Sequence, residues 1–218
     1  MTPKISEHQR KEREKQILYA AKRVFERKGF EPTTMKDVVE ESGMSRGGVY
    51  MYFGSTEELF KGVFALLDKE RSNIHEHWKE INEKSAEQIL VIFIEMLLQD
   101  IQTTDDEIKA FAPVILEYLS TSWRNNERRQ YMKSRYEGAL QFFEQFFERI
   151  IREKELNPLM SATDLAHFTL SFNEGLLLTH HHFSEEDTRL LEQYEALQRS
   201  LVHLLQINTE GKKYEGEH

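Results

Sequence analysis

Apolar residues recur at helical spacing along nearly the whole chain, and no run alternates long enough to form a half-buried strand. The first amphipathic segment extends from Ser6 to Lys28. Its apolar face consists of Ile17, Ala20, Ala21, Val24 and Phe25. Gly29 stands where a glycine commonly ends a helix, and Pro32 prevents any continuation. The pattern predicts an all-α protein whose first helix ends just before Gly29.

Two short helices follow. Thr34 is a good N-cap, and Asp37, three residues later, completes a variant of the capping box. Gly43 can adopt a left-handed conformation and end this helix. Ser45 then caps a third helix, which we expect over Arg46 to Phe53. The chain therefore begins with three helices, of which the second and third are joined by a tight turn.

Longer helices occupy the rest of the chain. Ser55 caps a fourth helix, with Glu58 as its capping-box partner, and we expect this helix to run past Trp78. Five further amphipathic segments cover residues 86–103, 105–121, 125–154, 164–182 and 185–207. About nine helices are thus predicted in total. The predicted divisions are a three-helix domain over 1–54, a helical domain over 55–207 that begins with a connecting helix over 55–80, and a polar tail over 208–218.

The segment from residue 34 to residue 53 has the length and order of a helix-turn-helix. In that motif the second helix enters the major groove of DNA by its N-terminal end. Ser45 and Arg46 occupy this end, where free backbone N–H groups and the helix dipole favour phosphate. The Arg46 guanidinium is also long enough to reach O6 and N7 of a guanine. The segment predicts a DNA-reading helix.

Two pairs of residues within this helix are informative. Gly47 and Gly48 each cost about 0.5–1 kcal/mol relative to alanine inside a helix, so their presence needs a reason. Either the backbone comes close to DNA here, or this helix packs closely on the one before it. Tyr50 and Tyr52 leave the helix in different directions, so one can donate its hydroxyl to a phosphate while Val49 packs inward.

Residues 10–64 resemble the N-terminal domain of the TetR family of transcriptional regulators. The matching residues are Phe25, Gly29-Phe30, Thr33-Thr34, Gly43-Met44-Ser45, the run from Ser45 to Phe53, and Glu57 to Phe60. The resemblance implies a dimeric regulator, with an N-terminal DNA-binding domain and a C-terminal helical domain that binds a small molecule and a second copy of the chain.

The resemblance also assigns DNA contacts to individual positions. It implies phosphate contacts by Thr34 and Tyr50, with Tyr52 as a third, and it places Ser45, Arg46, Gly47 and Gly48 in the groove. Two positions depart from the family pattern. Thr56 stands where a lysine is frequent, so that phosphate contact is either weakened or replaced, through the backbone at the helix start around Thr56 or through Lys61. Gly48 stands where a slightly larger residue is usual, which puts base recognition at this position in doubt.

Two surfaces are expected in the C-terminal domain. The family resemblance implies that the last two helices pair with their copies in a homodimer. The candidate interface residues are Leu165, Phe168, Phe172, Gly175, Leu176, Leu190, Tyr194, Leu197, Leu201 and Leu204. An effector pocket is implied among the preceding helices, and their aromatic content suggests an apolar or aromatic small molecule. The candidate pocket residues are Phe93, Met96, Phe111, Tyr118, Trp123, Tyr136 and Phe172. The alternative for both sets is burial in an ordinary intramolecular core.

Composition narrows these possibilities. The net charge is −9, yet nine basic and four acidic side chains lie between Lys4 and Lys28, so the N-terminal part alone suits DNA. Cysteine is absent, and consecutive histidines at His180-His182 cannot converge on one ion from a helix, so we expect no metal and no cofactor. No apolar run is long enough to span a membrane, and a cytoplasmic protein is expected.

Two other functional classes stay open from the sequence. A helical protein-interaction module with a DNA-incompetent helix-turn-helix would fit the acidic total and Thr56. A helical enzyme that uses the aromatic residues as an active site is disfavoured, because no acid–base, nucleophile or metal grouping is recognisable. The sequence therefore predicts a DNA-binding regulator that is not an enzyme.

Overall fold

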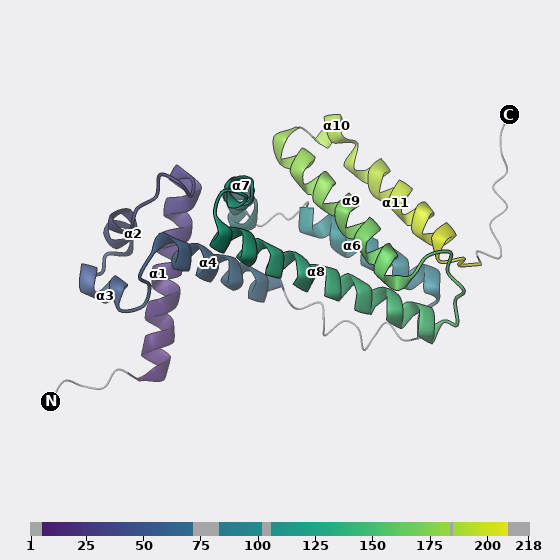
Figure 1. Cartoon of the computed structure of the whole chain (residues 1–218), viewed down its shortest axis with the longest axis horizontal. Coiled ribbons are helices and arrows are strands. Elements are labelled where there is room, and N and C mark those ends of the chain that lie inside the picture. Colours follow the sequence, from purple (N-terminus) through teal and green to yellow (C-terminus); the bar gives the residue numbers. More distant parts are fainter. Residues whose placement is uncertain (1–5, 72–82, 102–105, 184, 209–218) are drawn as a thin grey trace. The chain divides into compact units, whose positions relative to one another are not determined.

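The computed structural model of the 218-residue chain describes residues 6–71, 83–101, 106–183 and 185–208. Within these ranges all regular structure is helical, which confirms the predicted all-α class (Figure 1). The helices are α1 (Glu7–Lys28), α2 (Met35–Ser42), α3 (Arg46–Tyr50), α4 (Thr56–Arg71), α6 (Ala86–Ile101), α7 (Asp106–Ser122), α8 (Asn126–Glu153), α9 (Ala162–His182), α10 (Glu185–Thr188) and α11 (Leu190–Leu204). The end of the fourth helix past Trp78 and the tail beyond Asn208 lie outside the described residues.

The chain forms two compact units that do not follow chain order. Unit 1 comprises residues 1–77 and 104–129, and unit 2 comprises residues 78–103 and 130–218. Helices α1 to α4 and α7 therefore belong to unit 1, while α6, α9, α10 and α11 belong to unit 2. Helix α8 starts in unit 1 and continues into unit 2. The division by packing thus adds α4, α7 and the first turn of α8 to the helix-turn-helix.

Aromatic side chains form the centre of unit 1. Helix α1 packs against α2, α4 and α7, and contributes Phe25, which is fully buried. Phe60 of α4 stacks on Tyr118 of α7 with ring centroids 3.9 Å apart, and Phe30 meets the Tyr118 ring edge-on at 4.8 Å. Phe111 of α7 is also fully buried and contacts the Phe25 and Phe60 rings. Burial of such rings stabilises the unit, at about 1.5–3 kcal/mol for each apolar side chain.

The helix starts of unit 1 follow from local sequence. Thr34 caps α2: its hydroxyl accepts from the Asp37 N–H, and the Asp37 carboxylate accepts from the Thr34 N–H at 2.9 Å. Ser45 caps α3, as predicted, with its hydroxyl accepting from the Gly48 N–H. Ser55 accepts from the Glu58 N–H, but the Glu58 carboxylate accepts from the N–H of Gly54 and not of Ser55, so the expected capping box is displaced by one residue.

Unit 2 has its own apolar core. Phe93 of α6 stacks on Phe146 of α8 with centroids 3.9 Å apart, and α11 packs against α6 and α9. The buried Tyr194 hydroxyl lies 2.6 Å from the side-chain oxygen of Asn173. The helix predicted over 185–207 is wrong in one respect: Arg189 adopts a left-handed conformation with φ 48°, which separates α10 from α11.

The α2 cap gives a pH-dependent contribution to stability. The Lys28 ammonium, 2.5 Å away, and the Thr34 hydrogen bonds lower the pKa of Asp37 from 3.8 to about 2. Because the folded-state pKa is depressed, the ionised carboxylate stabilises the fold above its ordinary pKa, and this contribution is lost as the pH falls from about 4 towards 2. We expect Asp37→Asn to lower the free energy of unfolding by about 1 kcal/mol at pH 7, because the carboxylate charge that pairs with Lys28 and suits the first turn of α2 is lost.

The check is urea denaturation of both proteins at several pH values between 7 and 3. The difference in free energy of unfolding between wild type and Asp37→Asn should become smaller as the pH is lowered. Lys36→Gln is a suitable control, because Lys36 is exposed on the same helix and pairs only loosely with Glu40 at 3.7 Å. A difference in free energy of unfolding that does not change with pH would contradict the role given to the Asp37 charge.

Candidate nucleic-acid interface

The tight turn before α3 is built as the sequence predicts. Gly43 ends α2 in a left-handed conformation with φ 67°, and the Ser45 hydroxyl accepts from the Gly48 N–H at 3.2 Å. Helix α3 ends at Tyr50, three residues earlier than expected, and the N–H groups of Tyr52 and Phe53 close a final turn on the Val49 carbonyl. Val49 is fully buried, so one face of this short helix is anchored in the unit.

The opposite face of α3 is open. Arg46 and Tyr50 are exposed, with 42% of Tyr50 accessible, and the Arg46 guanidinium lies 5.3 Å from the centre of the Tyr50 ring. A cation from the first residue of α3 and a phenol from its last residue thus lie side by side on the exposed face, and the exposed Ser45 precedes them. This combination supplies donors for phosphate oxygens and for base edges.

The two glycines of α3 can now be told apart. A Cβ atom added at Gly47 would meet nothing within 4 Å, so close helix packing does not explain this glycine. A Cβ at Gly48 would lie 3.2 Å from the Ser45 hydroxyl and 3.5 Å from the Met44 methyl group. Gly48 is therefore restricted by its own turn, whereas Gly47 leaves the outer surface of α3 free for a close approach from outside.

The other predicted DNA contacts lie in different environments. Thr34 is exposed at the start of α2, whereas Tyr52 and Thr56 are half-buried. Lys61 is held by α8, with its ammonium 2.6 Å from the Glu127 carboxylate. Thr34, Tyr52 and Thr56 stay predicted contacts, whereas Lys61 already has an ion-pair partner within the protein.

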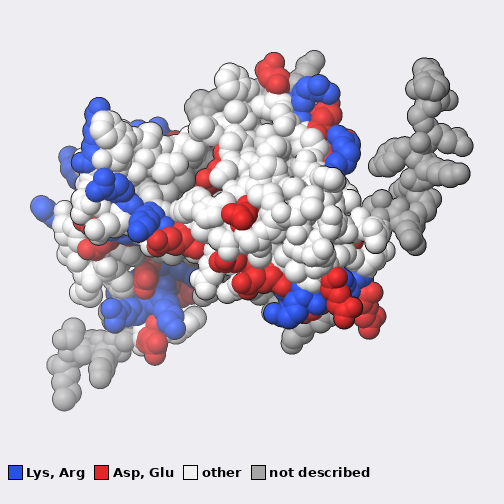
Figure 2. All heavy atoms as spheres, turned by 45° about the vertical axis from the view of Figure 1, so that its right-hand side comes forward, with Lys and Arg blue, Asp and Glu red and all other residues white. Residues whose placement is uncertain are grey.

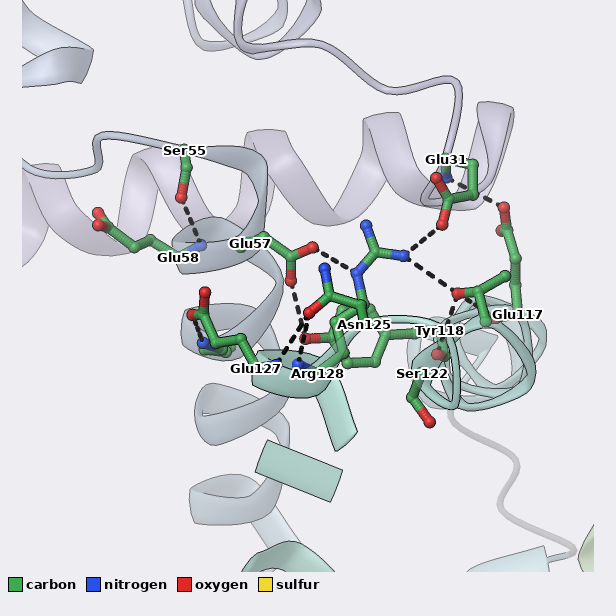
Figure 3. A network of polar contacts seen from close by, with 12 residues as sticks. Glu31, Ser55, Glu57, Glu58, Glu117, Tyr118, Ser122, Asn125, Glu127 and Arg128 are labelled. Atoms are coloured by element: carbon green, nitrogen blue, oxygen red, sulfur yellow. Dashed lines mark hydrogen bonds and ion pairs between the residues drawn. The ribbon is translucent and has the colours of Figure 1, made fainter. Parts of the chain in front are cut away.

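Sequence reasoning missed three residues near this region. Met51 is 71% exposed directly after α3, and Lys36 projects from α2 into solvent. Arg128, in the first turn of α8, contacts residues on both sides of the helix-turn-helix (Figure 3). A helical wheel would have found Lys36, but Arg128 gives no local signal, because its partners are 71 and 97 residues away.

The predicted pocket residues do not form one group. Phe111 and Tyr118 belong to the aromatic core of unit 1, and Trp123 is 65% exposed. In unit 2, Phe93 is buried on Phe146, while Met96, Tyr136 and Phe172 are half-buried against the same core. We expect only some of the seven to line a pocket, and this stays a prediction; Phe111 and Tyr118 pack on Phe60 in the core of unit 1. An open cavity of about 1120 Å³ in unit 2 lies elsewhere, between the ends of α8 and α11 and the start of α6.

Six of the ten predicted interface residues face inward. They are Leu165, Leu176, Leu190, Tyr194, Leu197 and Leu201, all buried in the core of unit 2. Phe172 and Leu204 are half-buried, and Phe168 and Gly175 are exposed. The sequence stripe selected the inner face, because both faces of these helices carry large apolar residues. The outer face of α9 and α11 carries Phe168, Leu178 and Leu191, which are exposed. Figure 2 shows a broad surface of the protein on which few Lys, Arg, Asp or Glu side chains appear.

Neither metal nor membrane features arise in the described part of the chain. No cluster of His, Asp or Glu side chains there could hold a metal ion, and the side chains of His181 and His182 lie outside it. None of the helices described is both long and apolar enough to cross a bilayer.

Known proteins match this chain over both units. Residues 17–63 match the family described as bacterial regulatory proteins, tetR family, and residues 89–211 match the tetracyclin repressor-like C-terminal domain. The HTH-type transcriptional regulator YfiR of Bacillus subtilis is 40% identical over 187 residues, which cover 85% of this chain and 88% of that protein. TtgR of Pseudomonas putida is 38% identical over 72 residues, or 33% of this chain and 32% of that one.

Solved structures share the fold. GusR of Salmonella enterica has a TM-score of 0.67 at 20% identity, over 93% of this chain and 98% of that one. FadR of Bacillus subtilis, solved in complex with stearoyl-CoA, has a TM-score of 0.64 at 16% identity, over 89% and 99% of the two chains. Together with the two sequence matches, the helix-turn-helix geometry shows that this chain belongs to the TetR family of helix-turn-helix transcriptional regulators.

Proposed function

We propose that the protein is a repressor that binds a palindromic operator as a homodimer and is released by a small apolar or aromatic effector. The observation that carries the proposal is the open face of α3, where Arg46, Gly47 and Tyr50 are turned outward while Val49 anchors the helix. An anchored helix with donors at its N-terminal end is what major-groove recognition needs.

Each proposed contact has a chemical role. Arg46 donates to a guanine edge or a phosphate, and the Tyr50 and Thr34 hydroxyls donate to phosphates. Ser45 and Gly48 are proposed to face the groove, and Tyr52 and Thr56 to contact further phosphates. Lys61 is the weakest member of the set, because it would have to leave the Glu127 carboxylate to reach a phosphate. Thr56 at the start of α4 is the better substitute for the lysine that the family often carries.

Dimerisation follows from the size of the reading element. Helix α3 has only five residues, so a single copy offers few base contacts. Two copies related by a two-fold axis read half-sites about 34–36 Å apart, or a multiple of that distance. The exposed apolar face of α9 and α11, with Phe168, Leu178 and Leu191, supports a self-complementary interface, and Gly175 leaves room for a partner helix.

An apolar effector is supported by the half-buried side chains around the unit 2 core and by one structural relative. Met96, Tyr136 and Phe172 lie against that core without being fully buried, so a ligand could extend it. FadR, which shares the fold, was solved with stearoyl-CoA, a ligand with a long acyl chain. A regulator of this kind acts where the chromosome is, in the cytoplasm.

The decisive experiment is fluorescence anisotropy with DNA from immediately upstream of the protein's own gene, over a salt series. Tight, salt-sensitive binding that survives non-specific competitor, with two protomers per site, supports a repressor. Binding no tighter than to random DNA across several promoters would favour the interaction module. Carboxylates converging in a ligand-accessible cavity would revive the enzyme alternative.

Removing the exposed cation of α3 tests base and phosphate recognition. We expect Arg46→Ala to weaken operator binding by about 10-fold or more, since one good base or phosphate contact contributes about 1–3 kcal/mol. The melting temperature should change little, because Arg46 is exposed. Lys133→Ala, an exposed site on α8 with the same loss of charge, is the matched control and should bind DNA like wild type. Equal effects of the two variants would contradict the assignment.

Gly47 allows stability and DNA binding to be separated. Gly47→Ala should raise the free energy of unfolding by about 0.5–1 kcal/mol, because alanine is the better helix former and its Cβ meets no protein atom. The same methyl group should weaken operator binding, because it occupies the space proposed for DNA. Gly138→Ala on α8 is matched, since a Cβ there also meets nothing within 4 Å, and it should gain stability without losing affinity. A Gly47→Ala protein with unchanged affinity would argue against close DNA approach.

A charge on the outer face of α9 tests the dimer. Leu178 is 46% exposed, and Leu178→Glu should shift the protein from dimer to monomer in sedimentation velocity, since a buried unpaired carboxylate is costly at an interface. Leu159→Glu makes the same change at a similarly exposed leucine in the α8–α9 loop and should leave the dimer intact. If Leu178→Glu remains dimeric, the interface lies on another surface.

A further inference from the structure

One guanidinium contacts the chain on both sides of the helix-turn-helix. Glu31 lies three residues before Thr34, which caps α2, and Glu57 lies in the first turn of α4, just after α3. Arg128 forms ion pairs with both carboxylates: Nη1 with Glu31, and Nε with Glu57 at 2.5 Å (Figure 3). The entry and the exit of the DNA-reading segment are therefore tied to the same side chain.

The environment of Arg128 suits a fixed and not a mobile cation. Only 15% of its side chain is exposed, and its guanidinium carbon lies 4.6 Å from the centre of the Phe30 ring and 5.3 Å from that of Tyr118. Nη1 also donates to the Thr121 hydroxyl at 3.1 Å. Burial by itself lowers the pKa of Arg128, but the hydrogen bonds that it donates to Glu31 and Glu57 outweigh burial and raise the pKa above its ordinary value. A guanidinium stacks its flat face on rings while its fixed fork of N–H groups pairs with two carboxylates, and an ammonium has neither the flat face nor the fixed fork.

Helix α7 reinforces the same two anchor points. The Tyr118 hydroxyl donates to Glu57 at 2.8 Å, so this carboxylate is held from two sides. The Glu117 carboxylate accepts from the N–H groups of Phe30 and Glu31 at 2.7 and 3.0 Å. Gly29, with φ 84°, makes room for this contact, since a Cβ there would lie 2.7 Å from a Glu117 oxygen. The loop before α2 is thus fixed by α7 and by the first turn of α8.

We propose that Arg128 is a positioning residue for DNA recognition, which holds both ends of the helix-turn-helix and links their placement to α8. The proposal rests on the DNA-binding function proposed above, and Arg128 itself does not contact DNA. Because Arg128 lies in the first turn of α8, a shift of that turn moves Glu31 and Glu57 together. A movement of α8 thereby changes the presentation of α3 without any change in the residues that touch the operator.

The test must separate positioning from simple stabilisation and from direct phosphate binding. Arg128→Met removes the charge but keeps an apolar stem over the Phe30 and Tyr118 rings. Arg129→Met removes the same charge from the adjacent, exposed position, where the guanidinium bonds only Asn126 among the contacts described. Binding to DNA from upstream of the protein's own gene is measured for both variants over a salt series, together with the melting temperature.

Positioning predicts a specific pattern. Arg128→Met should lose about 10-fold or more in operator affinity, within the range of typical coupling effects, while the slope of log affinity against log salt stays that of wild type. Arg129→Met should keep its affinity within about two-fold. A slope that falls by about one unit in Arg128→Met would show a direct phosphate contact and overturn the proposal, as would wild-type affinity in that variant.

A triple variant without charges at the three positions controls for a loss of binding that is caused by unfolding. Arg128→Met combined with Glu31→Gln and Glu57→Gln leaves no unpaired charge, so its stability should return towards that of wild type. If Arg128 positions the segment, this stable variant still binds the operator weakly, and Arg128→Lys recovers only part of the affinity. Full recovery of DNA binding by the triple variant would mean that the ion pairs serve stability alone.

Amide hydrogen exchange provides a readout that needs no DNA. In Arg128→Met the amides of Phe30, Glu31 and Leu59 should exchange faster together, while those around the buried Val24 of α1 stay protected. Failure of the wild-type protein to bind any promoter DNA would refute the DNA-binding function, and exchange would still decide whether Arg128 holds both ends. Unchanged exchange at either end would overturn the proposal.

Discussion

The shared aromatic core of α1, α4 and α7 is the packing on which the DNA-reading surface depends. A segment of about fifty residues buries little apolar surface, so by itself it would be only marginally stable. In this protein the support comes from Phe111 and Tyr118, which lie far along the chain and pack on Phe25 and Phe60. Helix α7 also supplies the Glu117 carboxylate, which accepts from the N–H groups of the loop before α2. The first turn of α8 supplies Arg128, which pairs with Glu31 and Glu57.

Helix α3 shows why such a scaffold is needed. It has five residues, two of them glycine, and an isolated helix of that length would not form in water. Its conformation is imposed from outside, by the Ser45 cap at one end and by the buried Val49 on one face. Both glycines weaken the helix, and Gly47 leaves its outer surface without a side chain. The helical conformation of α3 therefore depends on the surrounding residues of unit 1 and not on its own helix propensity.

Features encoded by neighbouring residues were predictable from the sequence. The caps at Thr34, Ser45 and Ser55 are local in sequence, and so is the glycine turn at Gly43. Helix periods also indicated the all-α class. Partners separated by many residues were not predictable, because an apolar stripe shows that a face is buried but not what covers it. Tyr118 was therefore assigned to a pocket and Leu197 to a dimer face, although both are packed within the units.

The discontinuity of unit 1 has a consequence for how such regulators can be recombined. A hybrid joined near residue 55 would pair one protein's helix-turn-helix with another's α7, and would divide the aromatic core and the carboxylates around Arg128 between two unrelated parents. The part that can be transplanted as a whole is made of two pieces of chain, residues 1–77 and 104–129. Operator specificity can thus be exchanged between relatives without disturbing this core only if α7 and the first turn of α8 are transferred together with α3.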